Sequence, residues 1–118
     1  MSTTPNELTD PEDRKLVTLA RSARARTGAA EGACVRDGDG RTFAGATVEL
    51  PTLRLTAVQV AVAMAVTSGS RELEAVVVLG GAATIDEADL SVVRDVSGHG
   101  VPVHLAGPDG TVVATLAS

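Results

Sequence analysis

The side chains best suited to chemistry in this sequence are one cysteine, Cys34, and two histidines, His99 and His104. A histidine can activate a thiol as a nucleophile, and both residue types ligate metal ions. Cys34, however, lies in a short apolar run, where small buried cysteines are common. His99 stands between two glycines, and His104 alternates with apolar residues as in a strand. We therefore expect neither a Cys–His nucleophile pair nor a metal site here.

Two clusters of acidic residues are candidate cation sites. Asp37 and Asp39 have the spacing of a calcium-binding loop. Arg41 occupies the next ligand position, however, and Val48 stands where such a loop needs a bidentate glutamate. The second cluster precedes an apolar stripe, and the helix dipole there already explains its carboxylates; its members are Asp86, Glu87 and Asp89. Neither cluster predicts a cation site.

A basic cluster lies between residues 14 and 26 and consists of Arg14, Lys15, Arg21, Arg24 and Arg26. It is typical of a solvated helix face, and docking of an acidic partner is the alternative. The chain as a whole has a net charge of -5, which repels nucleic-acid phosphates. Phe43 is the only aromatic residue, so bases cannot stack on an aromatic platform. The sequence thus excludes nucleic acid as a partner.

Length and composition predict one globular domain that spans residues 10–118 and follows a flexible tail at 1–9. The 118 residues are 44% hydrophobic, enough for a core built from Val, Ala and Leu. A single cysteine cannot form an internal disulfide. The polar N-terminus lacks the apolar segment of a signal peptide, and the uncharged run at 55–70 is short for a membrane span. We expect a cytoplasmic protein without membrane contact.

Local signals predict three helices and five strands. Asp10, Pro11 and Gly28 mark the ends of a first helix, and the Thr84-x-x-Glu87 capping box begins a third that ends before Gly98. In the segment 55–68 large apolar residues alternate with small ones at period two, which by itself favours a strand. Its length and its alanines favour a buried helix instead. Strands are expected at 32–36, 41–49, 73–79, 101–106 and 111–116. The order α-β-β-α-β-α-β-β predicts a three-layer α-β-α domain with a mixed five-stranded sheet.

Several segments resemble the small cytidine deaminase family from about residue 16 to residue 116. Residues 19–24 are similar to the family's first helix, and Gly32-Ala33-Cys34 to its Val-Gly-Ala-Ala strand. Residues 45–49 are similar to the hairpin that ends Gly-Cys-Asn-Val-Glu-Asn, and residues 56–69 to the helix that opens Cys-Ala-Glu-Arg and closes Ala-Val-x-x-Gly. The resemblance implies the cytidine deaminase-like fold.

The same resemblance shows what the chain lacks. These deaminases hold a Zn²⁺ that activates water, and a glutamate carries the proton. The first zinc-ligand position falls on Thr56 and the glutamate position on Val58, while residues 84–89 contain no cysteine where the family has Pro-Cys-x-x-Cys. Glu49 matches the glutamate that contacts sugar hydroxyls, and its asparagine partner is Thr47. The candidate substrate-binding residues are therefore Thr47, Glu49 and Thr56, with no catalytic residue, no metal ligand and no cofactor.

These observations predict a catalytically inactive cytidine deaminase-like protein that acts as a homo-oligomer or binds an unknown protein partner. The resemblance implies dimers or tetramers that pack near the apolar helix at 55–68. Two alternatives remain open. One is a nucleoside deaminase with rearranged site residues, and the other is a nucleoside sensor that retains Glu49.

Overall fold

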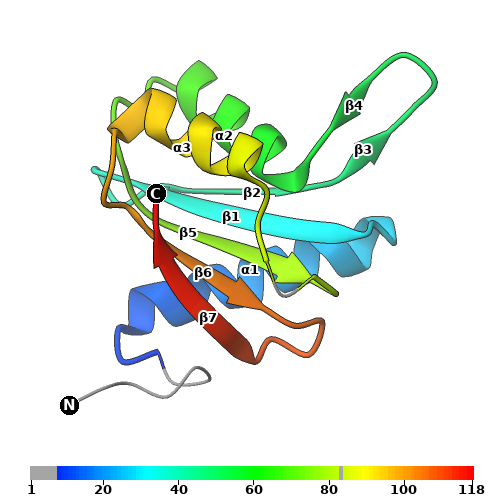
Figure 1. Cartoon of the computed structure of the whole chain (residues 1–118), viewed down its shortest axis with the longest axis horizontal. Helices are drawn as coiled ribbons and strands as arrows, with labels where there is room; N and C mark the ends of the chain where they lie inside the picture. The colour runs from blue at the N-terminus through cyan, green and yellow to red at the C-terminus, as the bar shows by residue number, and fades with distance from the viewer. Residues whose placement is uncertain (1–7, 83) are drawn as a thin grey trace.

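A five-stranded mixed sheet with one helix on one face and two on the other forms the protein, as predicted (Figure 1). The computed structural model describes residues 8–82 and 84–118, so most of the tail predicted at 1–9 lies outside the described residues. The elements in chain order are α1 (Pro11–Thr27), β1 (Glu31–Asp37), β2 (Thr42–Ala46), β3 (Val48–Glu49), β4 (Arg54–Leu55), α2 (Ala57–Thr67), β5 (Leu73–Gly80), α3 (Glu87–Ser97), β6 (Pro102–Ala106) and β7 (Val112–Ala117).

The strand order is β2-β1-β5-β6-β7. Strand β1 pairs antiparallel with both β2 and β5, and β6 pairs antiparallel with β7. Only β5 and β6 are parallel, because α3 crosses over between them. The short link between β6 and β7 permits only the antiparallel hairpin that the sequence predicts.

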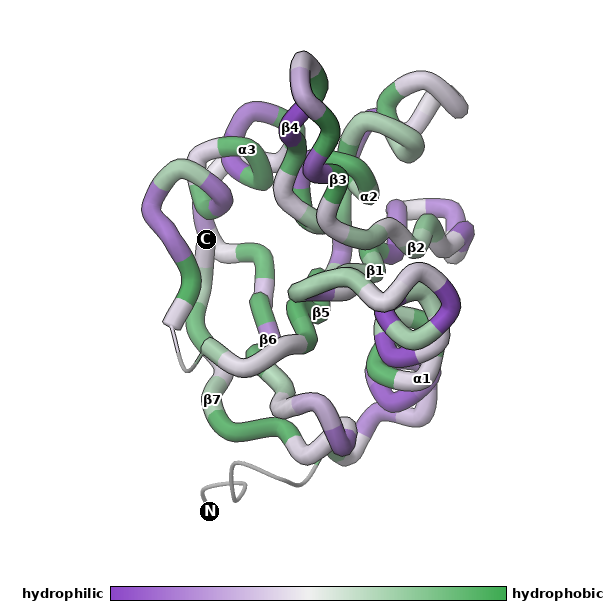
Figure 2. The backbone as a smooth tube through the Cα atoms, turned by 90° about the vertical axis from the view of Figure 1, so that its right-hand side faces the viewer, coloured by the Kyte–Doolittle hydropathy of each residue, from purple (hydrophilic) through white to green (hydrophobic). Residues whose placement is uncertain are grey.

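Successive side chains of each strand point to opposite faces of the sheet, so the core consists of two apolar layers. In β1, Ala33 and Val35 pack under α2 and α3, whereas Cys34 packs under α1 with Leu16 and Ala20. The central β5 is buried on both faces, and Figure 2 shows apolar residues concentrated on it and on α2, while α1 also carries polar residues. This continuous burial is what a β-branched run predicts for a central strand.

Helix α1 begins and ends where the local signals place it. The Asp10 side chain accepts a hydrogen bond from the Glu12 backbone N–H, and Gly28 ends the helix in a left-handed conformation with φ 65°. Gly32 allows the helix to approach β1, because a Cβ there would lie 2.1 Å from the Ala20 carbonyl oxygen. A larger residue would push α1 off the sheet.

Three local predictions are wrong. The strand expected at 41–49 ends at Ala46, and residues 48–49 form β3, which pairs with β4 in a small separate hairpin. Because Leu55 belongs to β4, the second helix begins at Ala57 and not at residue 55. Thr84 forms no capping box, because α3 begins at Glu87 with Asp86 at its N-cap and no side-chain cap bond. Helix α2 is buried on one side only, since Val66 is 49% exposed.

Within the described ranges, no helix combines the length and the apolar character needed to cross a bilayer.

Candidate functional site

A cavity of about 310 Å³ lies beside the N-terminus of α2 and brings together all three predicted binding residues, Thr47, Glu49 and Thr56. The start of β1, the β3–β4 hairpin and the first turn of α2 border it. The remaining lining residues are Ala30, Glu31, Val48, Arg54, Leu55 and Gln59. Its volume is at the small end of the roughly 300–1,000 Å³ typical of ligand pockets.

Thr56 connects α2 to α3. Its Oγ1 accepts a hydrogen bond from the Gln59 backbone N–H at 3.1 Å, and the Gln59 side chain accepts one from the Thr56 N–H at 2.9 Å. This capping box begins α2. The Thr56 hydroxyl donates a hydrogen bond to Asp89 Oδ1 at 2.7 Å. The hydroxyl therefore ties the two helix N-termini together.

Thr47 and Glu49 differ in how they meet the cavity. The Thr47 hydroxyl accepts a hydrogen bond from the Glu31 backbone N–H at 3.1 Å and donates one to the Glu31 carbonyl oxygen at 3.3 Å, so it holds the end of β2 to β1. Glu49 is exposed and lies opposite Arg54 in the hairpin. Of the two, Glu49 is the better placed to contact a bound molecule.

Two acidic residues that the sequence analysis did not assign to the site belong to it: Glu31 lines the cavity, and Asp89 accepts the hydrogen bond from Thr56. Burial raises the pKa of the Glu31 carboxyl, and the nearby charges of Asp89 and Asp86 raise it further. Burial also raises the pKa of Asp89, although the hydrogen bond from Thr56 opposes this. Asp89 lies four residues before the buried Val93, a spacing that places it on the inward face of α3. That spacing is the sequence signal for it.

The donors at this place do not suit zinc. Zn²⁺ in deaminases needs thiolate or imidazole ligands, and the cavity offers hydroxyl, amide and carboxylate groups. Val58, at the glutamate position, is 1% exposed within the core. Across residues 8–82 and 84–118, no group of three or more His, Cys, Asp or Glu side chains is arranged to hold a metal ion.

Cys34 and His104 lie on the other face of the sheet. Both pair with Val77, on opposite sides of it, so they stand two strand spacings, about 9.6 Å, apart, beyond hydrogen-bonding distance. Burial raises the pKa of the Cys34 thiol to about 12. His104 bonds instead to Asp13 Oδ2 at 3.1 Å and to Thr115 Oγ1 at 2.8 Å. The structure therefore forms no Cys–His pair, and His99 is exposed at a turn.

Comparisons with known proteins agree with this architecture. Cytidine deaminase from Burkholderia pseudomallei is 23% identical, with a TM-score of 0.77 over 87% of this chain and 90% of that one. Cytidine deaminase from Mycobacterium leprae is 21% identical, with a TM-score of 0.70 over 90% and 94%. The Mycobacterium tuberculosis enzyme is 22% identical, with a TM-score of 0.68 over 88% and 90%. At these identities the likeness shows a shared fold.

A model of the family described as cytidine deaminase-like matches residues 9–110. The chain belongs to the cytidine deaminase-like family. No curated protein matches its sequence.

Proposed function

We propose that this protein is a non-catalytic member of the cytidine deaminase-like family. The observation that carries the proposal is the hydrogen bond from Thr56 to Asp89, at the position where the resemblance places a zinc ligand. Zinc-dependent deamination needs a metal-activated water and a carboxylate that shuttles its proton. Val58 can neither accept nor donate a proton, and the Thr56 hydroxyl is already engaged with the Asp89 carboxylate.

Metal analysis and an activity assay test the proposal together. Protein purified without a histidine tag should contain well under one zinc per chain, and a chelator should leave its Tm unchanged. Cytidine and deoxycytidine should not be deaminated with or without added Zn²⁺. Stoichiometric zinc or measurable deamination would favour the rearranged enzyme instead.

The cavity beside α2 supports a second candidate function, the binding of a small molecule that carries hydroxyl groups. Glu49 offers an exposed carboxylate and Gln59 an amide at the cavity rim, while Leu55 and Val48 supply apolar surface. A nucleoside has this combination of polar and apolar groups. We expect cytidine or uridine to raise the Tm of the protein, and Glu49→Gln to reduce the shift. A shift that Glu49→Gln leaves intact would place the ligand elsewhere.

We also propose that the protein forms homo-oligomers through the outer face of α2. The helix contains no charged residue. A shallow apolar groove of about 430 Å³ runs along it, lined by Leu55, Val62, Val66 and Val92 among others. Water contact with such a surface is unfavourable, and association of two copies would relieve it.

Substitution of Val66 tests this interface, because Val66 is 49% exposed and an aspartate there should not disturb the core of a monomer. Val62 is unsuitable, since it is only 5% exposed and its loss would disrupt the core. Light scattering should show an oligomer for the native chain and a smaller species for Val66→Asp. Val113→Asp is the matched control, because Val113 is similarly exposed, at 44%, on β7. A native monomer at high micromolar concentration would contradict the proposal.

A further inference from the structure

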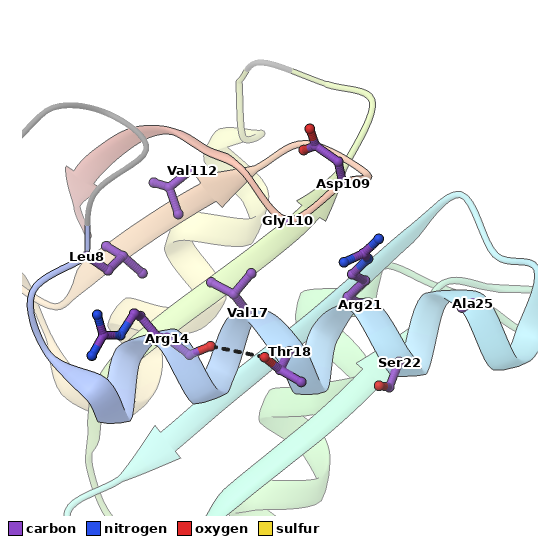
Figure 3. Close-up of a pocket in the computed structure, with 10 residues that line it drawn as sticks. All are labelled: Leu8, Arg14, Val17, Thr18, Arg21, Ser22, Ala25, Asp109, Gly110 and Val112. Atoms are coloured by element: carbon purple, nitrogen blue, oxygen red, sulfur yellow. Dashed lines mark hydrogen bonds between the residues drawn. The ribbon is translucent and has the colours of Figure 1, made fainter.

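A second and larger cavity, of about 590 Å³, lies on the opposite face of the sheet, between α1 and the turn that joins β6 to β7 (Figure 3). It exists because α1 packs over β1, β5 and β2 and leaves the side of β7 uncovered. None of the residues that line the cavity beside α2 lines this one. Any role it has is therefore independent of the function proposed above.

The floor of this cavity is apolar. Leu8, Val17 and Val112 come from three separate segments and point towards one another (Figure 3). Val112 is 3% exposed, so its side chain already belongs to the core, while Val17 and Leu8 are half-buried. An apolar chain laid along the floor would lose water contact without displacing any hydrogen-bonded group.

Two arginines of α1, Arg14 and Arg21, line the same cavity. They are seven residues apart, which places them on one face of the helix about 10 Å apart along its axis. Val17 stands between them, so the positive charges flank the apolar floor (Figure 3). Helix α1 holds five of the ten basic residues of the chain and two of the fifteen acidic ones, although the net charge of the chain is -5.

The two ends of the cavity differ in charge. Asp109 lies at the Arg21 end. Hydrogen bonds from Thr111, together with the Arg21 charge, hold the pKa of the Asp109 carboxyl below its usual range, so it is ionised near neutral pH and partly compensates Arg21. Among the described residues no carboxylate forms an ion pair with Arg14. The Arg14 end therefore attracts an anion more strongly.

We propose that this cavity binds an organic anion with an elongated apolar body, such as an alkyl carboxylate or an alkyl phosphate. The anionic group lies at Arg14, where the guanidinium donates paired hydrogen bonds to carboxylate or phosphate oxygens. The alkyl chain lies over Val17 and Val112. Arg21 and Asp109 close the other end, and the volume falls within the usual range for a small-molecule site.

Calorimetric titration of the full chain with octanoate, octyl phosphate and octanol tests the proposal. We expect both anions to bind more tightly than octanol, which has the same chain without the charge. Shortening octanoate to hexanoate should weaken binding by up to about fourfold for each methylene removed. If octanol binds as tightly as octanoate, the cavity is merely apolar and the proposal fails. The anion that binds more tightly identifies the preferred head group.

Matched variants locate the site. Arg14→Gln should weaken octanoate binding by about two- to fivefold, the range for a solvent-exposed ion pair. Asp109→Asn should strengthen it, because a negative charge is removed from the cavity wall. Arg26→Gln makes the same change of charge on the same helix but outside the cavity, and should leave the affinity unchanged. Equal weakening by Arg14→Gln and Arg26→Gln, or no binding by the native chain, would overturn the proposal.

Discussion

Replacement of Asp13 by asparagine should be among the most destabilising near-isosteric changes on the α1 side of the sheet. The Asp13 carboxylate bonds to Arg36 Nη1 at 2.8 Å and to His104 Nε2 at 3.1 Å. The side chains of Asp13, Arg36 and His104 are 15%, 11% and 7% exposed. Asp13→Asn removes the charge from this group while it keeps the shape and one acceptor oxygen.

The magnitude follows from the burial of the pair. Removing one partner of a fully buried ion pair costs about 3–5 kcal/mol, because the other charge is left without compensation. Arg36 keeps a second bond, from Nε to Glu74 Oε2 at 3.1 Å, and Glu74 is 47% exposed. We therefore expect a loss of about 2–3 kcal/mol in the free energy of unfolding. For a domain of this size that lowers the Tm by roughly 6–15 °C.

Two control variants separate this network from other effects of charge. Glu74→Gln removes the more exposed partner of Arg36 and should cost less than about 1 kcal/mol. Glu12→Gln removes a neighbouring first-turn charge together with its exposed ion pair to Lys15 at 3.1 Å, and should cost about 0.3–1 kcal/mol. Urea unfolding measures the loss in unfolding free energy for each of the three variants relative to the native chain. A loss in Asp13→Asn no larger than in Glu74→Gln would refute the reasoning.

Three further outcomes are expected. The double variant Thr56→Cys, Val58→Glu should remain inactive on cytidine and should unfold more easily by several kcal/mol, because it buries a carboxylate with no partner; deaminase activity would contradict this. Burial raises the pKa of the Asp37 carboxyl, but hydrogen bonds from Ser70 and Arg41 outweigh burial and lower the pKa below 3.8. The ionised carboxylate therefore stabilises the fold above that pH, and this stabilisation is lost as the pH falls through the folded pKa. Asp37→Asn should therefore cost about 2–4 kcal/mol at pH 7 and less in acid. The pKa of the Asp89 carboxyl is raised above 3.8, so ionisation of Asp89 destabilises the fold as the pH rises through the folded pKa. Asp89→Asn removes this titration and should flatten that part of the plot of unfolding free energy against pH.

The elements that sequence reasoning located correctly have signals within a few residues of their ends. The Asp10 cap, Pro11 and the left-handed Gly28 are local properties of α1. The burial of β5 follows from an unbroken β-branched run. Such features do not depend on distant parts of the chain, so one sequence is enough to predict them.

The β3–β4 hairpin could not be found in the same way. Each strand has two residues, too few to display a period, and the pairing of Val48 with Leu55 depends on the turn between them. The exposed side of α2 was missed for a different reason. Its valines predict burial, but the sheet has only one face to offer, and α3 covers only part of the remainder.

In the candidate site, too, some residues have local sequence signals, and another depends on contacts between distant parts of the chain. The resemblance selects Thr47, Glu49 and Thr56 as candidates, because each stands in a recognisable local motif, and all three line one cavity. Asp89 joins them only through a hydrogen bond between residues 33 positions apart. The helix dipole alone explains its carboxylate as a helix N-terminal charge. The spacing from Val93 indicates that Asp89 faces inward, but its bond to Thr56 depends on the packing of α3 on α2.

The proposed absence of zinc also bears on how this fold is held together. A metal that joins ligands from two helices stabilises the fold through several bonds, whereas one hydrogen bond to a charged group contributes only about 1.5–3 kcal/mol. On the proposed function, the Thr56–Asp89 bond cannot replace such a centre by itself, and burial raises the pKa of Asp89, which reduces its benefit near neutral pH. Apolar packing is the other stabilising contribution at this position. Val58 contributes about 1.5–3 kcal/mol by complete burial at the position where the resemblance places a polar glutamate.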